Sequence, residues 1–268
     1  MARPRTSAVA RLRSGSARLG GSSRPRHARS PPRPEPAPPP ASAESLAARY
    51  SRLAGEQFEP RTVDVVLRGL DIAIGATALV AAAPLIASIS LAVRATSGSP
   101  VLYRGQRVGR AGAVFTMYKF RTLTPDAETR LGPFSGGELT QLTESEVTDV
   151  GRVLRTTQLD ELPQLWNVLR GDMSIVGPRP IRPTFFEELC AQIPQYWQRL
   201  VVRPGMTGFA QIRLTRDDTW SEKLAHDLEY IADRSVSLYA RAIVETGWRV
   251  LRRTAAAIAG RPVPPPAS

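Results

Sequence analysis

Residues 72–93 read IAIGATALVAAAPLIASISLAV, a run of 22 residues without a charged side chain. A straight helix of this length would be about 33 Å long, enough to cross the roughly 30 Å hydrocarbon core of a bilayer. Pro84 stands in the middle of the run, where it removes a backbone donor and clashes with the preceding turn. We therefore expect a break at Pro84, and neither half, at about 18 Å and about 14 Å, would cross a bilayer alone.

Arginines stand on both sides of this apolar run. Arg61 and Arg68 precede it, and Arg94 follows it directly. The positive-inside rule keeps such flanks cytoplasmic, which is satisfied by a segment that enters the membrane, turns at Pro84 and leaves on the same face. The sequence therefore predicts a re-entrant membrane helix over residues 61–98 with both ends cytoplasmic. A kinked helix that spans the membrane is the second interpretation, and a buried Ala-rich core helix is the third.

The pattern changes after the apolar run. Turn residues separate two short β-prone runs, Val101–Tyr103 and Val114–Tyr118, which predicts a β-hairpin. Residues 124–148 are polar and contain glycine, as in a mobile loop, and mainly helical patterns follow from Val150.

The helical patterns of the second half include a stripe of large apolar residues. The stripe runs between residues 159 and 169, and further helices are expected near residues 184–200 and 219–258. Such a stripe usually packs into a core, and beside a membrane segment it is equally suited to the interface. The expected fold class is α+β and mainly helical: a monotopic membrane protein with a Pro-broken re-entrant helix, a small β-hairpin and amphipathic interfacial helices.

The chain has 268 residues and a net charge of +12, and eight of these positive charges fall in residues 1–43. That segment contains nine arginines, nine prolines and one acidic residue, so it cannot bury enough apolar surface to offset the entropy of ordering. We expect a disordered arm at 1–43, a lead-in helix at 44–60, a catalytic domain at 99–258 and a disordered tail at 259–268. The arm is most simply a solvated tail; a lipid tether, a nucleic-acid arm and a transit peptide are the alternatives.

Cysteine and histidine are scarce. Cys190 is the single cysteine, and His27 and His226 are the two histidines. These counts exclude an internal disulfide framework, a Cys-based zinc site and a multi-histidine metal site. If the chain is an enzyme, its chemistry therefore depends on carboxylates, Lys and Arg.

Residues 155–180, RTTQLDELPQLWNVLRGDMSIVGPRP, concentrate such groups. Asp160 and Glu161 stand just before Pro163, where we expect a helix to start. One interpretation is ordinary helix chemistry, because acidic residues favour the N-terminal end and proline suits the first turn. The other is a phosphate site, because a helix N-terminus attracts anions and Arg155 and Arg179 flank the carboxylates. A carboxylate can attack phosphorus to form an acyl phosphate, and Mg²⁺ prefers carboxylate and phosphate oxygens.

The motifs in their order resemble the bacterial sugar transferases, the monotopic polyprenyl-phosphate phosphoglycosyl transferases. The resemblance covers roughly residues 61–250. The residues that carry it are LDELPQLWNVLRGDMSIVGPRP, preceded by VGRVLR and followed by RPGMTGFAQ, together with R-x-x-D at Arg68–Asp71, SGSPVLYRGQRVGR, FTMYKFRTL and DLEYIADRSVSLY.

The resemblance implies transfer of phospho-sugar from a UDP-sugar to polyprenyl (undecaprenyl) phosphate, the first membrane step of surface glycan or exopolysaccharide assembly. It implies a ping-pong reaction in which Asp160 is the nucleophile that carries phospho-sugar. Glu161 would assist at the metal or in proton handling, with Mg²⁺ or Mn²⁺ held by both carboxylates. The residues expected to bind phosphate are Arg155, Arg179, Lys119, Arg121 and Arg203.

The same resemblance places the enzyme at the cytoplasmic face of the bacterial inner membrane, with membrane lipid as a partner and a homodimer left open. Two other classes of function remain alternatives. One is a membrane-anchored scaffold whose Asp–Glu pair only caps a helix. The other is a basic nucleic-acid-binding protein, which the absence of aromatic residues from the arm disfavours, so no nucleic-acid partner is expected.

The chain departs from the family pattern at a few positions outside the Asp–Glu pair. Gly105 stands where a glutamine is common, and Thr122 and Leu123 replace Ser and Met. Glu146 stands where a basic residue is frequent. Ala83 replaces a polar residue before the proline, which removes a hydroxyl able to satisfy a freed backbone carbonyl.

Overall fold

The computed structural model describes residues 61–125, 127, 145–215 and 218–259. All of them belong to one compact unit, residues 39–268. The arm and the lead-in helix expected at residues 1–60, most of the expected loop and nearly all of the expected tail lie outside the described residues.

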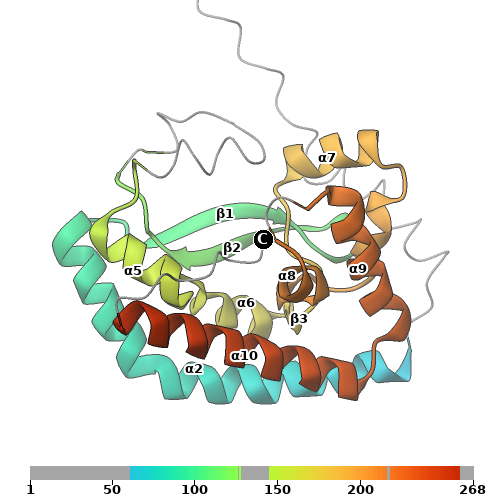
Figure 1. Cartoon of the computed structure of the whole chain (residues 1–268), viewed down its shortest axis with the longest axis horizontal. Helices are drawn as coiled ribbons and strands as arrows, with labels where there is room; N and C mark the ends of the chain where they lie inside the picture. The colour runs from blue at the N-terminus through green and yellow to red at the C-terminus, as the bar shows by residue number, and fades with distance from the viewer. Residues whose placement is uncertain (1–60, 126, 128–144, 216–217, 260–268) are drawn as a thin grey trace, which may run out of the picture. The chain divides into compact units, whose positions relative to one another are not determined.

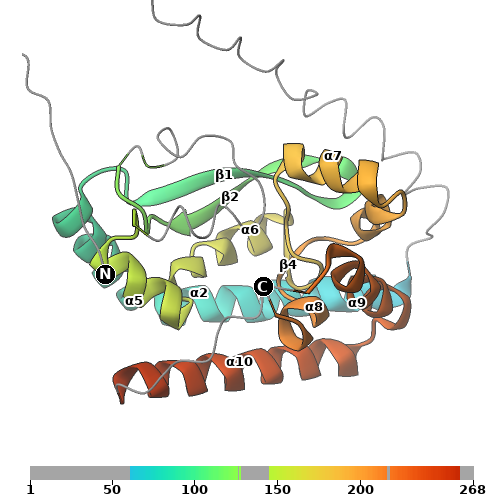
Figure 2. The same ribbon diagram turned by 45° about the horizontal axis from the view of Figure 1, so that its top comes forward.

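The apolar run forms helix α2 (Thr62–Ser97), which is assigned as one continuous helix with Pro84 inside it. Its ribbon changes direction between a long N-terminal section and a shorter C-terminal section (Figures 1 and 2). The helix is long and apolar enough to cross a membrane, by length and composition, and only 11% of its most apolar window is buried. The interpretation as a buried core helix is therefore wrong, because side chains such as Val80 and Leu91 remain exposed.

Two side chains of the R-x-x-D motif fasten α2 to the rest of the fold. The Arg68 guanidinium donates to the carbonyl oxygens of Val168 and Leu169, at 2.7 and 2.9 Å. The buried Asp71 Oδ1 accepts three hydrogen bonds of 2.8–2.9 Å, from Ser174 Oγ, Ile175 N and Tyr239 Oη. A polar motif at the start of an apolar helix therefore anchors that helix to the remaining elements.

The predicted hairpin is confirmed. Strands β1 (Leu102–Val108) and β2 (Val114–Phe120) pair antiparallel and are joined through the short turn η1 (Arg110–Gly112). Phe115 and Met117 of β2 pack against the buried Val168 and Met173. This packing sets the hairpin on helix α6 (Gln164–Arg170), which in turn packs on α2 (Figure 1).

The remaining elements are short, apart from the last two helices. They are α5 (Asp149–Thr157), η2 (Leu159–Glu161), β3 (Ser174–Val176), α7 (Pro183–Gln192), η3 (Tyr196–Val201), β4 (Gly205–Thr207), α8 (Phe209–Arg213), α9 (Trp220–Asp233) and α10 (Val236–Ile258). Strands β3 and β4 pair in parallel as a second small sheet. The α+β, mainly helical class is therefore as expected.

Three expected helices are interrupted. The helix expected near 184–200 ends at Ile193, because Pro194 disfavours helical geometry in the residue before it. The helix expected at 219–258 breaks at Arg234, whose guanidinium forms an ion pair with Asp64 of α2. The apolar stripe between 159 and 169 is divided between η2 and α6, and it is not one buried face, because Trp166 is 52% exposed.

Helix α10 runs alongside α2 (Figure 2). Its outer surface exposes Val244, Trp248 and Leu251, at 60–70% of their full accessible area. These positions are four and three residues apart, so they share one face of the helix. The helix is therefore amphipathic, with a second apolar face close to that of α2.

Candidate active site

The Asp–Glu pair lies in a sharp turn between α5 and α6. Gln158 ends α5 in the left-handed conformation, with φ 58° and ψ 15°, and reverses the chain. Asp160 and Glu161 then occupy the single turn η2, and α6 begins after Pro163 without a hydrogen bond from any capping side chain. No side-chain hydrogen bond caps α6, so neither carboxylate serves as its cap.

Glu161 is held by a lysine from the hairpin. Lys119 Nζ of β2 lies 2.5 Å from Glu161 Oε1, and each side chain keeps no more than a fifth of its exposure. Burial raises the pKa of Glu161, but the positive charges of Lys119 and Arg179 outweigh it and leave that pKa below its usual range. Glu161 therefore stays ionised at neutral pH.

The neighbouring carboxyl group behaves in the opposite way. Burial raises the pKa of Asp160 to about 6, against the lowering effect of Lys119 and Arg155, and the negative charge of Glu161 adds to the rise. The apolar surroundings are supplied by Leu159 and Leu162, which pack with the C-terminal half of α2. Two adjacent carboxyl groups whose pKa values are displaced in opposite directions are typical of a division of catalytic roles.

Arg155 reaches the pair from the last turn of α5. Its Nε donates to Thr122 Oγ1 at 2.9 Å. Thr122 stands where the family commonly has serine, and its hydroxyl serves as the acceptor of this bond. Helix α5 can approach so closely because residue 151 is glycine: a Cβ there would collide with the Thr122 carbonyl oxygen. Arg155 is thereby held on the side of Asp160.

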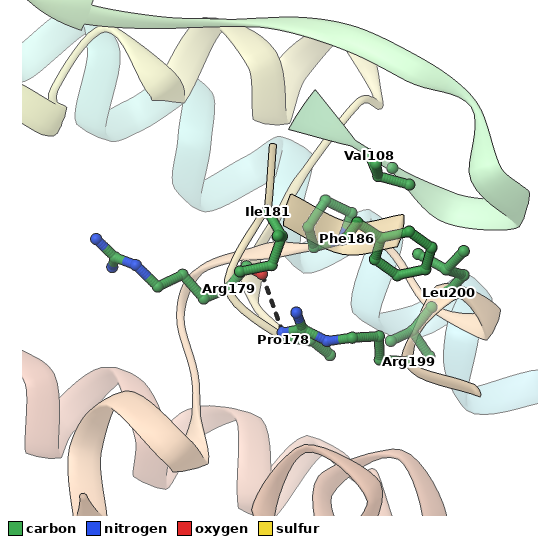
Figure 3. A pocket seen from close by; sticks show the side chains of 10 residues that line it. Val108, Pro178, Arg179, Ile181, Phe186, Arg199 and Leu200 are labelled. Carbon is green, nitrogen blue, oxygen red and sulfur yellow. Dashed lines mark hydrogen bonds between the residues drawn. The ribbon is translucent and has the colours of Figure 1, made fainter. Parts of the chain in front are cut away.

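Arg179 belongs to the GPRP loop that follows β3. Its carbonyl oxygen accepts a hydrogen bond of 2.9 Å from Arg199 Nη2, which fixes the loop (Figure 3). Arg199 is itself buried in an ion pair of 2.7 Å with Asp227. Figure 3 shows the Arg179 side chain pointing away from a small hollow lined by residues that include Phe186 and Leu200. The charge that acts on Glu161 thus lies outside that hollow, and the hollow is not the carboxylate site.

Two of the arginines expected to bind phosphate are committed to backbone carbonyls elsewhere. Arg121 is buried and donates to the carbonyl oxygens of Ser97 and Gly98 at the end of α2. Arg203 Nε donates to the carbonyl oxygen of Gly171 at 2.9 Å. Lys119, Arg155 and Arg179 therefore act on the carboxyl pair, whereas Arg121 and Arg203 have structural contacts of their own.

The metal ion predicted at Asp160 and Glu161 would need some of its ligands from a substrate. Within the described part of the chain, no group of three or more His, Cys, Asp and Glu side chains gathers to hold a metal ion. Mg²⁺ commonly binds through one or two carboxylates together with substrate phosphates and water. Asp160 and Glu161 fit such a site, in which a diphosphate supplies the remaining oxygens.

One important residue was missed by the sequence interpretation. Asn167 is fully buried in α6, and its Nδ2 donates to Thr116 O at 2.7 Å and to Asp172 Oδ2 at 3.0 Å. Its Oδ1 accepts from Tyr118 N at 3.0 Å. These bonds fix β2 against α6 and so position Lys119 beside the carboxylates. The available signal was an amide within an apolar stripe, since a buried amide needs partners; Gln164 is a second buried amide of the same stretch.

Most of the chain matches a known protein family. The sequence profile of the family described as "Bacterial sugar transferase" matches residues 62–253. That range includes α2, the hairpin, the carboxylate turn and most of α10.

Several curated proteins are similar to this chain. It is 36% identical over 185 residues to the UDP-N-acetylgalactosamine-undecaprenyl-phosphate N-acetylgalactosaminephosphotransferase of Aeromonas hydrophila, an alignment that covers 68% of this chain and 42% of that protein. It is 39% identical over 195 residues to the UDP-glucose:undecaprenyl-phosphate glucose-1-phosphate transferase of Caulobacter vibrioides, covering 69% of each. It is 37% identical to the exopolysaccharide production protein PSS of Rhizobium leguminosarum, covering 69% of this chain and 94% of that protein. The chain belongs to the bacterial sugar transferase family.

Proposed function

We propose that this chain transfers phospho-sugar from a UDP-sugar to polyprenyl (undecaprenyl) phosphate, with Asp160 as the nucleophile. The observation that carries the proposal is the carboxyl pair, in which the pKa of Asp160 is raised to about 6 and that of Glu161 is lowered. The class of donor and acceptor rests on the names of the relatives from Aeromonas and Caulobacter.

In the first step, a carboxylate oxygen of Asp160 attacks the sugar-bearing phosphorus of the donor. The bond from that phosphorus to the bridging oxygen breaks, and uridine monophosphate leaves with the oxygen. An acid with a pKa of about 6 suits this task, because it is largely ionised at pH 7 and more basic than an ordinary aspartate. Arg155 and Arg179 lie where they can neutralise the charge of the diphosphate.

In the second step, an oxygen of the lipid phosphate attacks the same phosphorus. The acyl-phosphate bond breaks, Asp160 returns to a carboxylate, and the sugar diphosphate is left on the lipid. Because the same phosphorus reacts twice at one aspartate, the two substrates bind in turn, which is a ping-pong mechanism.

Glu161 has a different role from its neighbour. The ion pair with Lys119 and the lowered pKa keep it ionised, so it is unsuited to donate a proton at neutral pH. We assign it to the metal site with Asp160. A metal bound there would supply positive charge to the diphosphate and to its leaving group.

We place the enzyme at the cytoplasmic face of the inner membrane, with α2 as a re-entrant segment. Support comes from the exposed apolar face of α2, the bend of its ribbon and the position of Pro84 within it. Helix α10 runs alongside α2, and its exposed row, which includes Trp248, suits the membrane interface. If membranes carrying the protein release it on washing without detergent, this placement is wrong.

The chemical proposal is tested by Asp160→Asn. Purified protein is screened with UDP-sugars, polyprenyl phosphate and Mg²⁺ for release of uridine monophosphate, and chelation of the metal should stop turnover. We expect the substitution to lower release at least about a thousandfold, as is usual when a nucleophile is removed. Asp149→Asn is the matched control, because its carboxylate is almost fully exposed on α5.

Omission of the acceptor gives a second test. The wild-type protein should then release about one equivalent of uridine monophosphate and stop, leaving phospho-sugar on Asp160. Turnover by Asp160→Asn, or the lack of this first release in an enzyme that turns over with acceptor, would contradict the covalent mechanism.

A further inference from the structure

Gly105, where this chain departs from the family pattern, lies in the middle of strand β1. A Cβ at this position would lie 2.5 Å from Tyr103 Oη and 2.8 Å from Arg107 Nη1. The phenol and the guanidinium therefore fold toward each other over the glycine from either side. A larger residue would force them apart.

The hairpin register places this row on the same face as the active-site lysine. Tyr103 pairs with Lys119, and Gly105 pairs with Met117. Opposite residues in an antiparallel pair point to the same side, and positions 103, 105 and 107 alternate with the exposed Arg104 and Gln106. Tyr103 is therefore the cross-strand neighbour of the lysine that holds Glu161.

The other end of the row meets the loop that follows GPRP. Val108 N donates to Ile181 O at 2.9 Å in an antiparallel bridge, whose register sets Arg107 opposite Arg182. Arg179 is also close: its charge acts on both Arg107 and Glu161. The charge of Arg179 thus acts both on the carboxyl pair and on the Arg107 end of the hairpin.

Arg107 lies in an unusual environment for a cation. Burial lowers its pKa, and the charges of Arg182 and Arg179 lower it further, against the effect of Tyr103. Like charges placed directly opposite each other destabilise a strand pair. A bound anion between these side chains would relieve that repulsion, and arginines suit phosphate because their planar donors match its oxygens.

We propose that Arg107 and Arg182, with Tyr103 folded over Gly105, form a subsite for the nucleotide phosphate of the donor. The inference rests on the proposed function, since the phosphate assigned to this subsite is the one that leaves with the nucleotide. Arg107 and Arg182 are substrate-binding residues, and Tyr103 positions Arg107.

The arrangement along the hairpin favours the donor over the lipid acceptor. The start of β1 packs with Ile89 and Val93 of α2 and with the leucines beside Asp160, whereas its end at Val108 packs in a core without any residue of α2. The Cα atoms of Tyr103 and Arg107 are four positions apart on the strand, about 14 Å, although their side-chain ends meet over Gly105. The lipid phosphate therefore meets the carboxylates from the α2 side, and the nucleotide extends toward Arg107.

The test measures binding of UDP to the full-length protein in detergent, by calorimetry, with Arg107→Gln and Arg182→Gln. Loss of a charged hydrogen bond to phosphate should weaken UDP binding about tenfold to a hundredfold for Arg107→Gln and raise the KM for the UDP-sugar similarly. Arg107→Lys should recover part of the loss. Arg104→Gln, on the same strand and the opposite face, should leave binding unchanged.

Gly105→Ala provides a variant that tests geometry without removing a charge. The added Cβ would meet only the far ends of two flexible side chains, so we expect the fold to persist and UDP binding to weaken. Circular dichroism checks the fold.

The outcomes separate the two proposals. UDP binding by Arg107→Gln equal to that of the wild type would overturn the subsite, even if the wild type turns over normally. A raised KM for polyprenyl phosphate with an unchanged KM for the donor would overturn the assignment to the nucleotide and give the subsite to the lipid phosphate. If Asp160→Asn retains turnover while Arg107→Gln loses UDP binding, the mechanism fails and the subsite stands.

Discussion

Replacement of Lys119 by methionine should shift the pH dependence of the reaction. The lysine lies 2.5 Å from Glu161 Oε1, and both side chains are about four-fifths buried. It lowers the pKa of both Asp160 and Glu161, so its loss must raise the pKa of each carboxyl group. Methionine keeps the length of the aliphatic stem and removes only the charge.

The size of the shift follows from the burial of the pair. Removal of one partner from a buried ion pair costs about 3–5 kcal/mol, and the partial exposure here reduces this to about 2–3 kcal/mol. One pKa unit corresponds to about 1.4 kcal/mol. Because the two carboxyl groups titrate together, we expect their apparent pKa values to rise by about one to two units in total.

The assay is the rate of uridine monophosphate release between pH 5 and pH 9. The acidic limb of the wild-type profile should have its midpoint near pH 6, the pKa of Asp160. In Lys119→Met that midpoint should move toward pH 7, so the loss of activity is large at pH 6 and shrinks at pH 9. Lys119→Arg keeps the charge and should keep the midpoint. An acidic limb that stays near pH 6 in Lys119→Met would refute the electrostatic coupling on which the mechanism depends.

Three further substitutions test the same arrangement. Asp160→Asn should raise the thermal unfolding midpoint in detergent at pH 8 but not at pH 3.5. The folded-state pKa of about 6 lies above the ordinary aspartate value of 3.8, so the wild type loses up to about 3 kcal/mol of stability as the pH rises through that interval. Asp227→Asn should destabilise the fold by about 3–5 kcal/mol, because it leaves the buried Arg199 without its partner at 2.7 Å; unchanged resistance to urea would contradict this. Asn167→Leu should cost about 2–4 kcal/mol and lower activity further, because the backbone groups of Thr116 and Tyr118 lose their partners; a fully active variant would show that Asn167 does not position the hairpin.

The features that the sequence predicted well are local. An uncharged run of 22 residues gives a long exposed helix, and alternating β-prone residues between turns give a hairpin, because both patterns depend on near neighbours. The choice of the Asp–Glu pair as the candidate site also came from its own segment, and it stays a prediction. Pro84 was less informative: we expected a break there, whereas α2 continues through it.

The contacts that organise the site join distant parts of the chain. Lys119 and Glu161 are 42 residues apart, and Arg155 and Thr122 are 33 residues apart. Nothing in the periodicity of either segment specifies such a pairing. For the same reason, Arg121 could not be recognised as a residue that holds the end of α2, since that role depends on where the helix ends in space.

Arginine, rather than lysine, supplies almost all the basic side chains of the chain. The chain contains two lysines, Lys119 and Lys223, and its other basic residues are arginines. Many of the described arginines donate to carbonyl oxygens at or near helix ends, where unpaired carbonyls and the helix dipole attract cations. Examples are Arg61 on Ala232, Arg68 on Val168 and Leu169, Arg121 on Ser97 and Gly98, Arg203 on Gly171, and Arg249 on Gln211 and Ile212.

A planar guanidinium can serve two carbonyls at once, as Arg68 does, whereas an ammonium group acts as a point charge. Arginine is therefore suited to joining helices, and much of the positive charge of the described residues is structural. The compact charge of Lys119 instead holds one carboxylate, that of Glu161, beside Asp160, the proposed nucleophile. The arginines that we propose for substrate binding are Arg155, Arg179, Arg107 and Arg182. The arginine content of the described residues therefore does not by itself indicate a polyanionic partner.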